Sequence, residues 1–407
     1  MVEKTLGDVA TYINGRAFKP QEWETSGRPI IRIQNLTNST QECNRTTKQF
    51  EEKYRISDGD LLFAWSASLG AHIWHGEDGW LNQHIFKVIP NESIDKIYLY
   101  YYLLYVVDQL YAKTHGSGMV HITLKPFKST RIMLPELNEQ RRVVGKIESL
   151  FAKLDEAKEK AQAVVDSFET RKAAILHKAF TGELTAKWRE EHGISIDNWK
   201  TTRFDSVAAI RSNLVDPAEY QSFPHIAPDN IEKKTGVLLE YHTIAEDGVT
   251  SGKHRFYSGQ ILYSKIRPYL SKAVVVDFDG LCSADMYPIE AYQNARCLWY
   301  YMLSDEFLLQ ASTAGSRSVL PKINQKELSA LTVHLPTNDR EQEEIARILD
   351  ELFDKEQRAK VAAESVLEQI DTIKKSILSR AFRGELGTND PSEESAVGLL
   401  KRGLEKK

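Results

Sequence analysis

The sequence has no long apolar run and no recognisable export signal. Of its 407 residues, 42% are hydrophobic and 27% are charged, and no stretch approaches the 18 or more apolar residues of a membrane span. The first residues lack the basic segment, apolar stretch and cleavage site of a secretory signal. We therefore expect a cytoplasmic protein with no membrane partner.

Cysteines and catalytic motifs are also scarce. Cys43, Cys282 and Cys297 do not have metal-site spacing, and their odd number does not suit a secreted disulfide framework. There is no Gly-x-Ser-x-Gly elbow, no phosphate-cradling loop and no His-Glu-x-x-His pair. The segment "DPAEY" lacks the second proline of an amino-methyltransferase motif, and no glycine-rich cofactor loop accompanies it. We expect no catalytic residue and no metal ligand.

The sequence has no surplus of positive charge. The formal net charge is −4, and residues 1–133 carry 15 basic against 14 acidic side chains, while residues 194–334 carry 14 against 16. Tight binding to phosphates by charge alone needs a clear basic excess. If this chain binds DNA, we expect a partner protein to contribute part of the affinity.

What the sequence does contain is an internal repeat. The phrases "ILHKAFTGEL" and "ILSRAFRGEL" end long matching segments in which Gly182 and Gly384 are equivalent, 202 residues apart. When Glu139-Gln140 is aligned with Glu341-Gln342, no gap is needed up to Leu184, which aligns with Leu386. Looser matches precede each segment, such as "SDGDLLFAW" with "YSGQILYSK", and "IYLYYYLLYVVDQLYAKTHGSG" with "ARCLWYYMLSDEFLLQASTAGSR". The sequence therefore predicts two copies of one unit.

Each copy contains a narrow apolar stripe with alternating three- and four-residue steps. In the first copy the stripe is Ile147, Leu150, Leu154, Ala157, Ala161, Val164, Phe168 and Ile175, with a break at Arg171. In the second copy it is Leu349, Leu352, Glu356, Ala359, Ala363, Val366, Ile370, Ile373 and Ile377. Such heptads predict two long helices that pair as an antiparallel coiled coil, each ending at its glycine.

Two charged residues interrupt these stripes. Glu356 stands where the first copy has Leu154, and Arg171 is equivalent to Ile373. We expect either that both lie at a solvent-exposed edge or that both meet partner subunits.

These patterns predict an α+β fold in which two globular domains alternate with two long helices around a pseudo-twofold axis. The Leu-Pro pairs at 134–135 and 335–336 mark the borders, because proline disfavours a helical conformation in the preceding residue. The expected parts are a first globular domain (1–133), a first helical spacer (134–193), a second globular domain (194–334), a second helical spacer (335–388) and a flexible polar tail (389–407).

Polar and basic loop residues lie among aromatic residues in both globular parts. Arg, Asn and Gln pair with base edges, and Lys and Arg bind phosphate. The candidate DNA-binding set is Arg16, Lys19, Arg32, Gln34, Asn35, Asn38, Gln83, His84 and Ser117 in the first part, and Lys265, Arg267, Tyr269, Asp285, Arg317, Ser318 and Lys322 in the second.

The order of parts and several motifs resemble the DNA-specificity subunit of type I restriction-modification systems. The likeness rests on the helix starts "LNEQRR" and "REQEEI", the helix ends "KAFTGEL" and "RAFRGEL", and the segments "INGRAFKPQEW", "PIIRIQNLTN", "LNQHIFKV" and "SKIRP". It covers nearly the whole chain, up to about Leu386. The resemblance implies that the globular parts are target recognition domains, each reading one half of a split DNA site, while the helices separate them.

The resemblance also implies the partners. This chain would be a non-catalytic subunit of a DNA adenine methyltransferase and restriction complex, binding double-stranded DNA, two methyltransferase (modification) subunits and, in the full complex, restriction/translocase subunits. S-adenosylmethionine would be on the methyltransferase subunits, with no cofactor on this chain. Two alternatives stay open: the specificity half of a split fused restriction enzyme-methyltransferase, and a coiled-coil protein-interaction scaffold without DNA contact.

Overall fold

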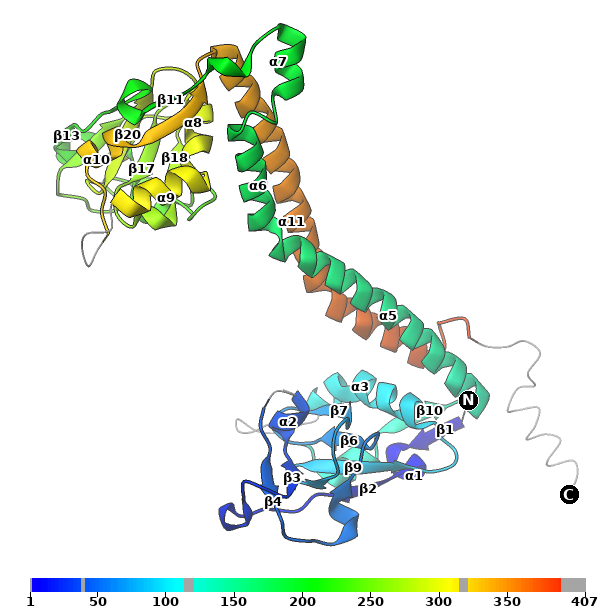
Figure 1. Ribbon diagram of the computed structural model, residues 1–407. Coiled ribbons are helices and arrows are strands. Elements are labelled where there is room, and N and C mark those ends of the chain that lie inside the picture. Colours follow the sequence, from blue (N-terminus) through cyan, green and yellow to red (C-terminus); the bar gives the residue numbers. More distant parts are fainter. Residues whose placement is uncertain (1, 38–40, 113–120, 315–320, 389–407) are drawn as a thin grey trace, which may run out of the picture. The chain divides into compact units, whose positions relative to one another are not determined.

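The computed structural model describes residues 2–37, 41–112, 121–314 and 321–388 (Figure 1). The chain divides into two compact units: unit 1 holds the residues up to Ala161 and those from Ser365 onward, and unit 2 is Gln162–Glu364. Each unit contains sheets and parts of long helices, so the predicted α+β class is confirmed. The predicted tail, 389–407, lies outside the described residues.

The globular part of unit 1 is built on two four-stranded sheets. The first has the antiparallel order β2 (Ala10–Asn14), β9 (Ile85–Pro90), β6 (Leu61–Ala64), β7 (Gly70–Ile73), and the second has the order β4 (Asn44–Thr46), β3 (Arg28–Ile31), β8 (Gly79–Leu81), β5 (Arg55–Ile56). A ribbon pairs β1 (Val2–Thr5) with β10 (Arg131–Leu134). The helices are α1 (Leu6–Val9), α2 (Ile33–Thr37), α3 (Lys96–Ala112) and α4 (Leu124–Lys128).

The globular part of unit 2 repeats this plan. Its sheets have the orders β12 (Ala208–Ile210), β20 (Met286–Ala291), β17 (Ile261–Ser264), β18 (Ala273–Val275), and β13 (Leu214–Val215), β16 (Lys253–Phe256), β19 (Gly280–Cys282), β14 (Pro224–Ile226), β15 (His242–Thr243). A ribbon pairs β11 (Trp199–Arg203) with β21 (Thr332–Pro336). The helices are α8 (Ala295–Met302), α9 (Asp305–Ala314) and α10 (Gln325–Ala330).

The two globular parts have the same strand pairings, except that β13 extends the second sheet of unit 2 by one strand. Each has one parallel pair in its second sheet, β3 with β8 and β14 with β19, while the other pairings of the sheets are antiparallel. Each core packs aromatic side chains between sheet and helices: Phe127 against Tyr12 in unit 1, with ring centroids 5.0 Å apart, and Phe307 against Phe204 in unit 2, at 5.9 Å. The predicted internal repeat is therefore a repeat of structure.

Both predicted long helices are present. The first is α5 (Leu137–Asp166) followed directly by α6 (Phe168–Phe180), and the second is the single helix α11 (Asp339–Phe382). Two features were not anticipated. The first helix is interrupted at Ser167, whose hydroxyl donates to the carbonyl of Ala163 in addition to the backbone amide of Ser167 at 3.1 Å, a type of bond that often bends helices. A short helix, α7 (Ala186–His192), follows the first spacer's glycine.

The two equivalent glycines end the helices as predicted. Gly182 and Gly384 have φ of +79° and +75°, the left-handed conformation that favours glycine after a helix. The amide of Leu184 donates to the carbonyl of Lys178 at 3.2 Å, and the amide of Glu385 donates to the carbonyl of Arg380 at 2.9 Å. These bonds pair carbonyls that the helix ends would otherwise leave free.

Within each unit the long helices contact one another in antiparallel order. In unit 2, Phe168 meets Lys360, with the ammonium 4.8 Å from the ring centroid, and Arg171 Nε donates to Glu356 Oε2 at 2.7 Å. In unit 1, Lys374 Nζ is 2.6 Å from Asp155 Oδ1. Arg171 and Glu356, the two interruptions of the stripes, form an ion pair with each other, and their side chains are 33% and 24% exposed, so they do not lie at an open edge.

The predicted stripe of the second helix was partly wrong. Leu349, Ala363 and Ile370 are buried as expected, but Val366 and Ile373 are 41% and 40% exposed, and Ala359 is also exposed. The contact positions lie one residue later. At two of these positions lysine stems cover aromatic rings: Lys360 lies over Phe168, and Lys374 lies 5.1 Å from the ring centroid of Phe151.

The repeated glutamine at each helix start ties the helix to its globular part. Gln140 is fully buried and Gln342 is 3% exposed. Gln140 Nε2 donates to the carbonyls of Ser93 and Pro135 at 3.0 and 2.8 Å, and its Oε1 accepts from the amide of Asp95 at 2.8 Å. Gln342 Nε2 donates to the carbonyl of Pro336 and to Gln293 Oε1, both at 2.7 Å. The same side chain therefore makes the same kind of anchor twice.

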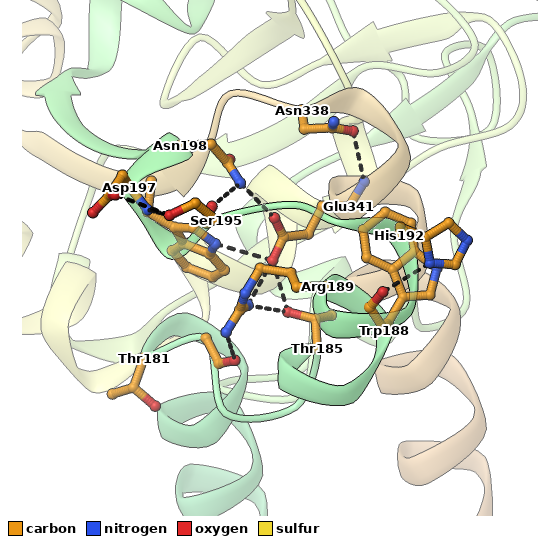
Figure 2. Close-up of polar contacts among 12 residues, drawn as sticks. Thr181, Thr185, Trp188, Arg189, His192, Ser195, Asp197, Asn198, Asn338 and Glu341 are labelled. Atoms are coloured by element: carbon orange, nitrogen blue, oxygen red, sulfur yellow. Dashed lines mark hydrogen bonds and ion pairs between the residues drawn. The ribbon is translucent and has the colours of Figure 1, made fainter.

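The neighbouring glutamate forms a second anchor in unit 2. Figure 2 shows the carboxylate of Glu341 among donors from the segment that follows α6. Glu341 is fully buried and accepts hydrogen bonds from Arg189 (2.7 Å), Thr185 (2.8 Å), Asn198 (3.0 Å) and Trp199 (3.0 Å). Burial alone would raise the pKa of Glu341, but these bonds outweigh it and lower the pKa. The start of α11 is thereby fixed to α7 and β11.

The helices of the described residues were also compared with the requirements of a bilayer. None of them combines the length and the apolar character that crossing a membrane demands.

Candidate nucleic-acid interface

The loop after β17 in unit 2 presents polar side chains on a strained backbone. Arg267 and Ser271 have φ of +49° and +46°, which is uncommon for residues with a Cβ atom and concentrates at functional sites. Between them, a short 3-10 turn leaves Tyr269 47% exposed. Arg267 is exposed and makes no ion pair with any residue that the structure describes. The loop therefore offers a free guanidinium beside an exposed aromatic ring.

Two further predicted residues join this loop through a shared carboxylate. Asp285 Oδ1 lies 3.0 Å from Lys322 Nζ and 4.0 Å from Lys265 Nζ. Lys265 also donates to the carbonyl of Ala284 and is mostly covered, and burial, reinforced by Lys322, lowers the pKa of its ammonium. Lys265 thus has a structural role, while Lys322 and Arg267 remain accessible for an anionic partner.

Backbone pairing identifies the equivalent place in unit 1. The amide of Ile323 donates to Lys265 O at 2.9 Å, and the amide of Lys265 donates to Asp285 O at 3.0 Å. In unit 1, the amide of Ile122 donates to Trp65 O at 3.0 Å, and the amide of Trp65 donates to His84 O at 3.1 Å. Trp65 and His84 therefore occupy the positions of Lys265 and Asp285.

The rest of the unit 1 loop follows the same correspondence. Ala67 has φ of +59° at the position of Arg267, and the bridge between Ser66 and His121 matches that between Ile266 and Lys322. Trp65 and His121 were not among the residues predicted from the sequence, although the match of "SDGDLLFAW" with "YSGQILYSK" already places Trp65 over Lys265.

The unit 1 site is aromatic where the unit 2 site is cationic. The ring of Trp65 lies 5.3 Å from that of His84 and 5.8 Å from that of Phe86, and its Nε1 donates to Asn14 Oδ1 at 3.0 Å. Beside it is a hollow of about 250 Å³. Gln83 Nε2 and His84 Nε2 lie 3.2 Å apart, while Gln83 Oε1 and His84 Nδ1 are buried and bond to no described residue. The site therefore contains two buried polar atoms without a partner among the described residues.

The other predicted residues of unit 1 lie in two segments, residues 16–19 and residues 32–35. Arg16 Nη2 is paired with Glu22 Oε1 at 2.7 Å, and its guanidinium lies 4.0 Å from the ring centroid of Phe50. Lys19 is exposed. The guanidinium of Arg32 lies 5.7 Å from the ring centroid of Trp23, which is 40% exposed.

The neighbouring helix α2 carries two more predicted residues. Gln34 is half-buried on it. Asn35 is buried, accepts from the amide of Arg32 at 3.0 Å and donates to the carbonyl of Gln41 at 3.2 Å. Its amide holds this loop together, so we do not carry Asn35 into the proposed interface.

Four predicted residues lie outside the described part of the chain: Asn38, Ser117, Arg317 and Ser318. Within the described part, no cluster of three or more His, Cys, Asp or Glu side chains is arranged to hold a metal ion.

Comparison with known proteins identifies the family. The model of the type I restriction modification DNA specificity domain matches residues 1–165 and 196–364. The EcoDI specificity subunit of an Escherichia coli type I restriction enzyme is 37% identical over 344 residues, covering 77% of each chain. The Escherichia coli EcoBI specificity subunit is 25% identical over 434 residues, covering 98% of this chain and 90% of that one.

Solved structures share the fold. The HsdS subunit from Thermoanaerobacter tengcongensis aligns with a TM-score of 0.64 and 18% identity, over 94% of this chain and 97% of that one. A chain from a structure on complex assembly and conformational transition of the type I R-M system aligns with a TM-score of 0.65 and 19% identity, over 94% and 98%. With the repeat, the two equivalent loops and the family match taken together, the chain belongs to the family of type I restriction-modification DNA specificity subunits.

Proposed function

We propose that this chain is the non-catalytic subunit that gives a type I restriction-modification complex its DNA sequence specificity. Residues 1–133 and 194–334 act as target recognition domains that each read half of a split site. Residues 134–193 and 335–388 are the spacers. The observation that carries the proposal is the pair of equivalent loops, in which Ala67 and Arg267 share a left-handed backbone within the same bonding pattern.

Two methyltransferase subunits complete the proposed assembly, with S-adenosylmethionine bound to them, and restriction/translocase subunits join in the full complex. The near balance of charge in both recognition domains supports a shared DNA interface, because partner subunits would supply the missing positive contacts. The exposed Val366 and Ile373 on α11 offer an apolar face to such partners. The cytoplasm, where DNA and these subunits meet, is the proposed location.

A methyl-transfer assay tests the division of labour. We expect no transfer from labelled S-adenosylmethionine to duplex DNA by the purified chain alone, and sequence-specific transfer once the cognate methyltransferase subunit is added. Methylome sequencing of cells that carry both subunits should then show adenine methylation at one bipartite sequence. Transfer by the isolated chain, or methylation without sequence preference, would contradict the proposal.

Substitutions in the two domains should affect different halves of that sequence. Arg32→Ala or Gln34→Ala should relax only one half-site, and Arg267→Ala or Lys322→Ala only the other. A bidentate base contact is worth about 1–3 kcal/mol, which corresponds to a roughly 5- to 150-fold loss of discrimination. Binding of the assembled complex to oligonucleotide pools measures the effect at each base pair.

Lys200→Ala is the matched control, since Lys200 is an exposed cation on β11 of unit 2, outside the loop. It should leave both half-sites unchanged. If a loop variant weakens binding equally on all sequences, that residue contacts phosphate, and the assignment of base reading to it is wrong.

A further inference from the structure

A groove in unit 2 runs between α6 and the turn that joins α8 to α9. It consists of two adjoining hollows of about 350 and 330 Å³, which share Ala173, Leu176 and Asp305 in their walls. Leu176 and Phe180 give the first hollow an apolar wall, and both are nearly fully buried. The groove is thus a built feature with a packed base.

The first hollow is lined by the carboxylates of Asp305 and Glu306 and by the imidazole of His177, while Glu169, Lys172 and Lys234 line the second hollow. Asp305 and Glu306 lie exposed in the first turn of α9, and neither forms an ion pair with a described residue. An apolar wall below free carboxylates suits the aliphatic stem and charged head of lysine or arginine. The same carboxylates would repel DNA phosphates, so nucleic acid does not suit the first hollow.

The equivalent position in unit 1 shows which charged contact can occupy the groove of unit 2. Two aromatic contacts set the correspondence: Phe180 meets Tyr301 at 5.0 Å and 88° in unit 2, and Phe382 meets Tyr102 at 5.1 Å and 89° in unit 1. The residue equivalent to Ala173 in the ungapped repeat is Lys375.

In unit 1, Lys375 Nζ donates to Asp108 Oδ2 on α3 at 2.9 Å. Helix α3 matches α8 and α9 of the other copy. Unit 1 therefore supplies its own ammonium to the carboxylate, whereas unit 2 keeps carboxylates, has alanine instead of lysine, and is hollow.

We propose that the groove beside Ala173 binds a lysine or arginine side chain of the methyltransferase subunit. The inference rests on the proposed function for the identity of the partner. The carboxylates of the groove, Glu169, Asp305 and Glu306, are all exposed and do not enclose a metal ion or small polyamine, whereas a protein segment fills the groove and buries its wall.

The test measures binding of the purified methyltransferase subunit to the full chain by isothermal titration calorimetry at several salt concentrations. The variant Asp305→Asn/Glu306→Gln removes the charge, and Ala173→Lys copies unit 1 by filling the site from within. Each should weaken binding by about tenfold, as expected for one desolvated charge pair, and reduce its salt dependence. Circular dichroism should show all variants folded, since Asp305 and Glu306 are exposed and Ala173 lies half-buried beside the open groove.

Two controls separate the outcomes. Glu240→Gln, an exposed carboxylate of unit 2 outside the groove, should bind like the unmodified chain. If both groove variants also bind like the unmodified chain, the groove is not a docking site, although the proposed function stands. If the unmodified chain binds no methyltransferase subunit, the proposed function fails and the inference with it. Loss of DNA binding without loss of subunit binding would assign the groove to nucleic acid and overturn the proposal.

Discussion

Inserting two residues into α5 between Ala157 and Val164 should abolish site-specific methylation, whereas inserting four should retain it at sites with a wider gap. Four residues add about 6 Å, close to two base pairs, and turn the helix about 40° beyond a full revolution. Two residues rotate the stripe by about 200°, so that Val164 and Phe168 leave the partner helix. Methylome sequencing of cells expressing each variant with the methyltransferase subunit measures activity and gap together.

A phase control and a length control sharpen this experiment. Seven inserted residues return the stripe to within about 20° of its original phase, so activity should persist with a gap widened by about three base pairs. Four residues inserted into α11 as well, between Lys360 and Leu367, keep the paired helices equal in length. An active four-residue variant with an unchanged gap would show that these helices do not set the spacing.

Glu341→Gln should be among the most destabilising single substitutions in this chain. It leaves the buried guanidinium of Arg189 without its carboxylate, and breaking a buried ion pair from one side costs about 3–5 kcal/mol. Urea unfolding followed by tryptophan fluorescence measures the loss, since Trp199 donates to the same carboxylate. Hydrogen exchange should rise first in the segment of α7 and in the first turn of α11.

The pH dependence provides an independent check. Because hydrogen bonds lower the pKa of Glu341 in the folded chain, its contribution is complete above the usual glutamate value of 4.5 and is lost as pH falls through the lower, folded pKa. Glu341→Gln should remove this part of the acid sensitivity.

The equivalent Glu139→Gln in unit 1 is the matched control. Glu139 is also buried, but its partner Arg142 is one-third exposed and keeps access to water when the carboxylate is removed, so the loss should be smaller than for Glu341→Gln. Equal losses for the two variants would show that burial does not distinguish the two sites.

The helices were predictable because their signals are local and occur twice. Heptad spacing and a capping glycine can be read directly from the sequence of each helix. The internal repeat shows the same two signals a second time. The error at Ala359, Val366 and Ile373 has a physical cause. These side chains are more apolar than Lys360 and Lys374, yet a lysine stem can cover an aromatic ring, and hydrophobicity alone does not reveal that. The pairing of Arg171 with Glu356 depends on the register between the two helices. The sequence pattern of one helix does not specify that register.

The candidate site was predictable only in part, because it joins distant segments. Lys265, Asp285 and Lys322 were all chosen from the sequence, and the structure brings them together through one carboxylate. Residue type could not separate a structural amide such as Asn35 from an accessible one. Trp65 was missed because an aromatic residue after a strand resembles ordinary core, although both the sequence match and the shared backbone pairing align it with Lys265.

The lysines that cover Phe151 and Phe168 bear on the order in which the chain is made. The α5–α6 segment emerges from the ribosome long before α11, and its apolar stripe has to wait for the correct partner. Two nascent chains could associate through their first helices in the meantime. The second helix then competes well for those rings, because its ammonium groups bind aromatic faces but repel each other in a pair of α11 helices. This feature would favour closure within one chain over association between chains.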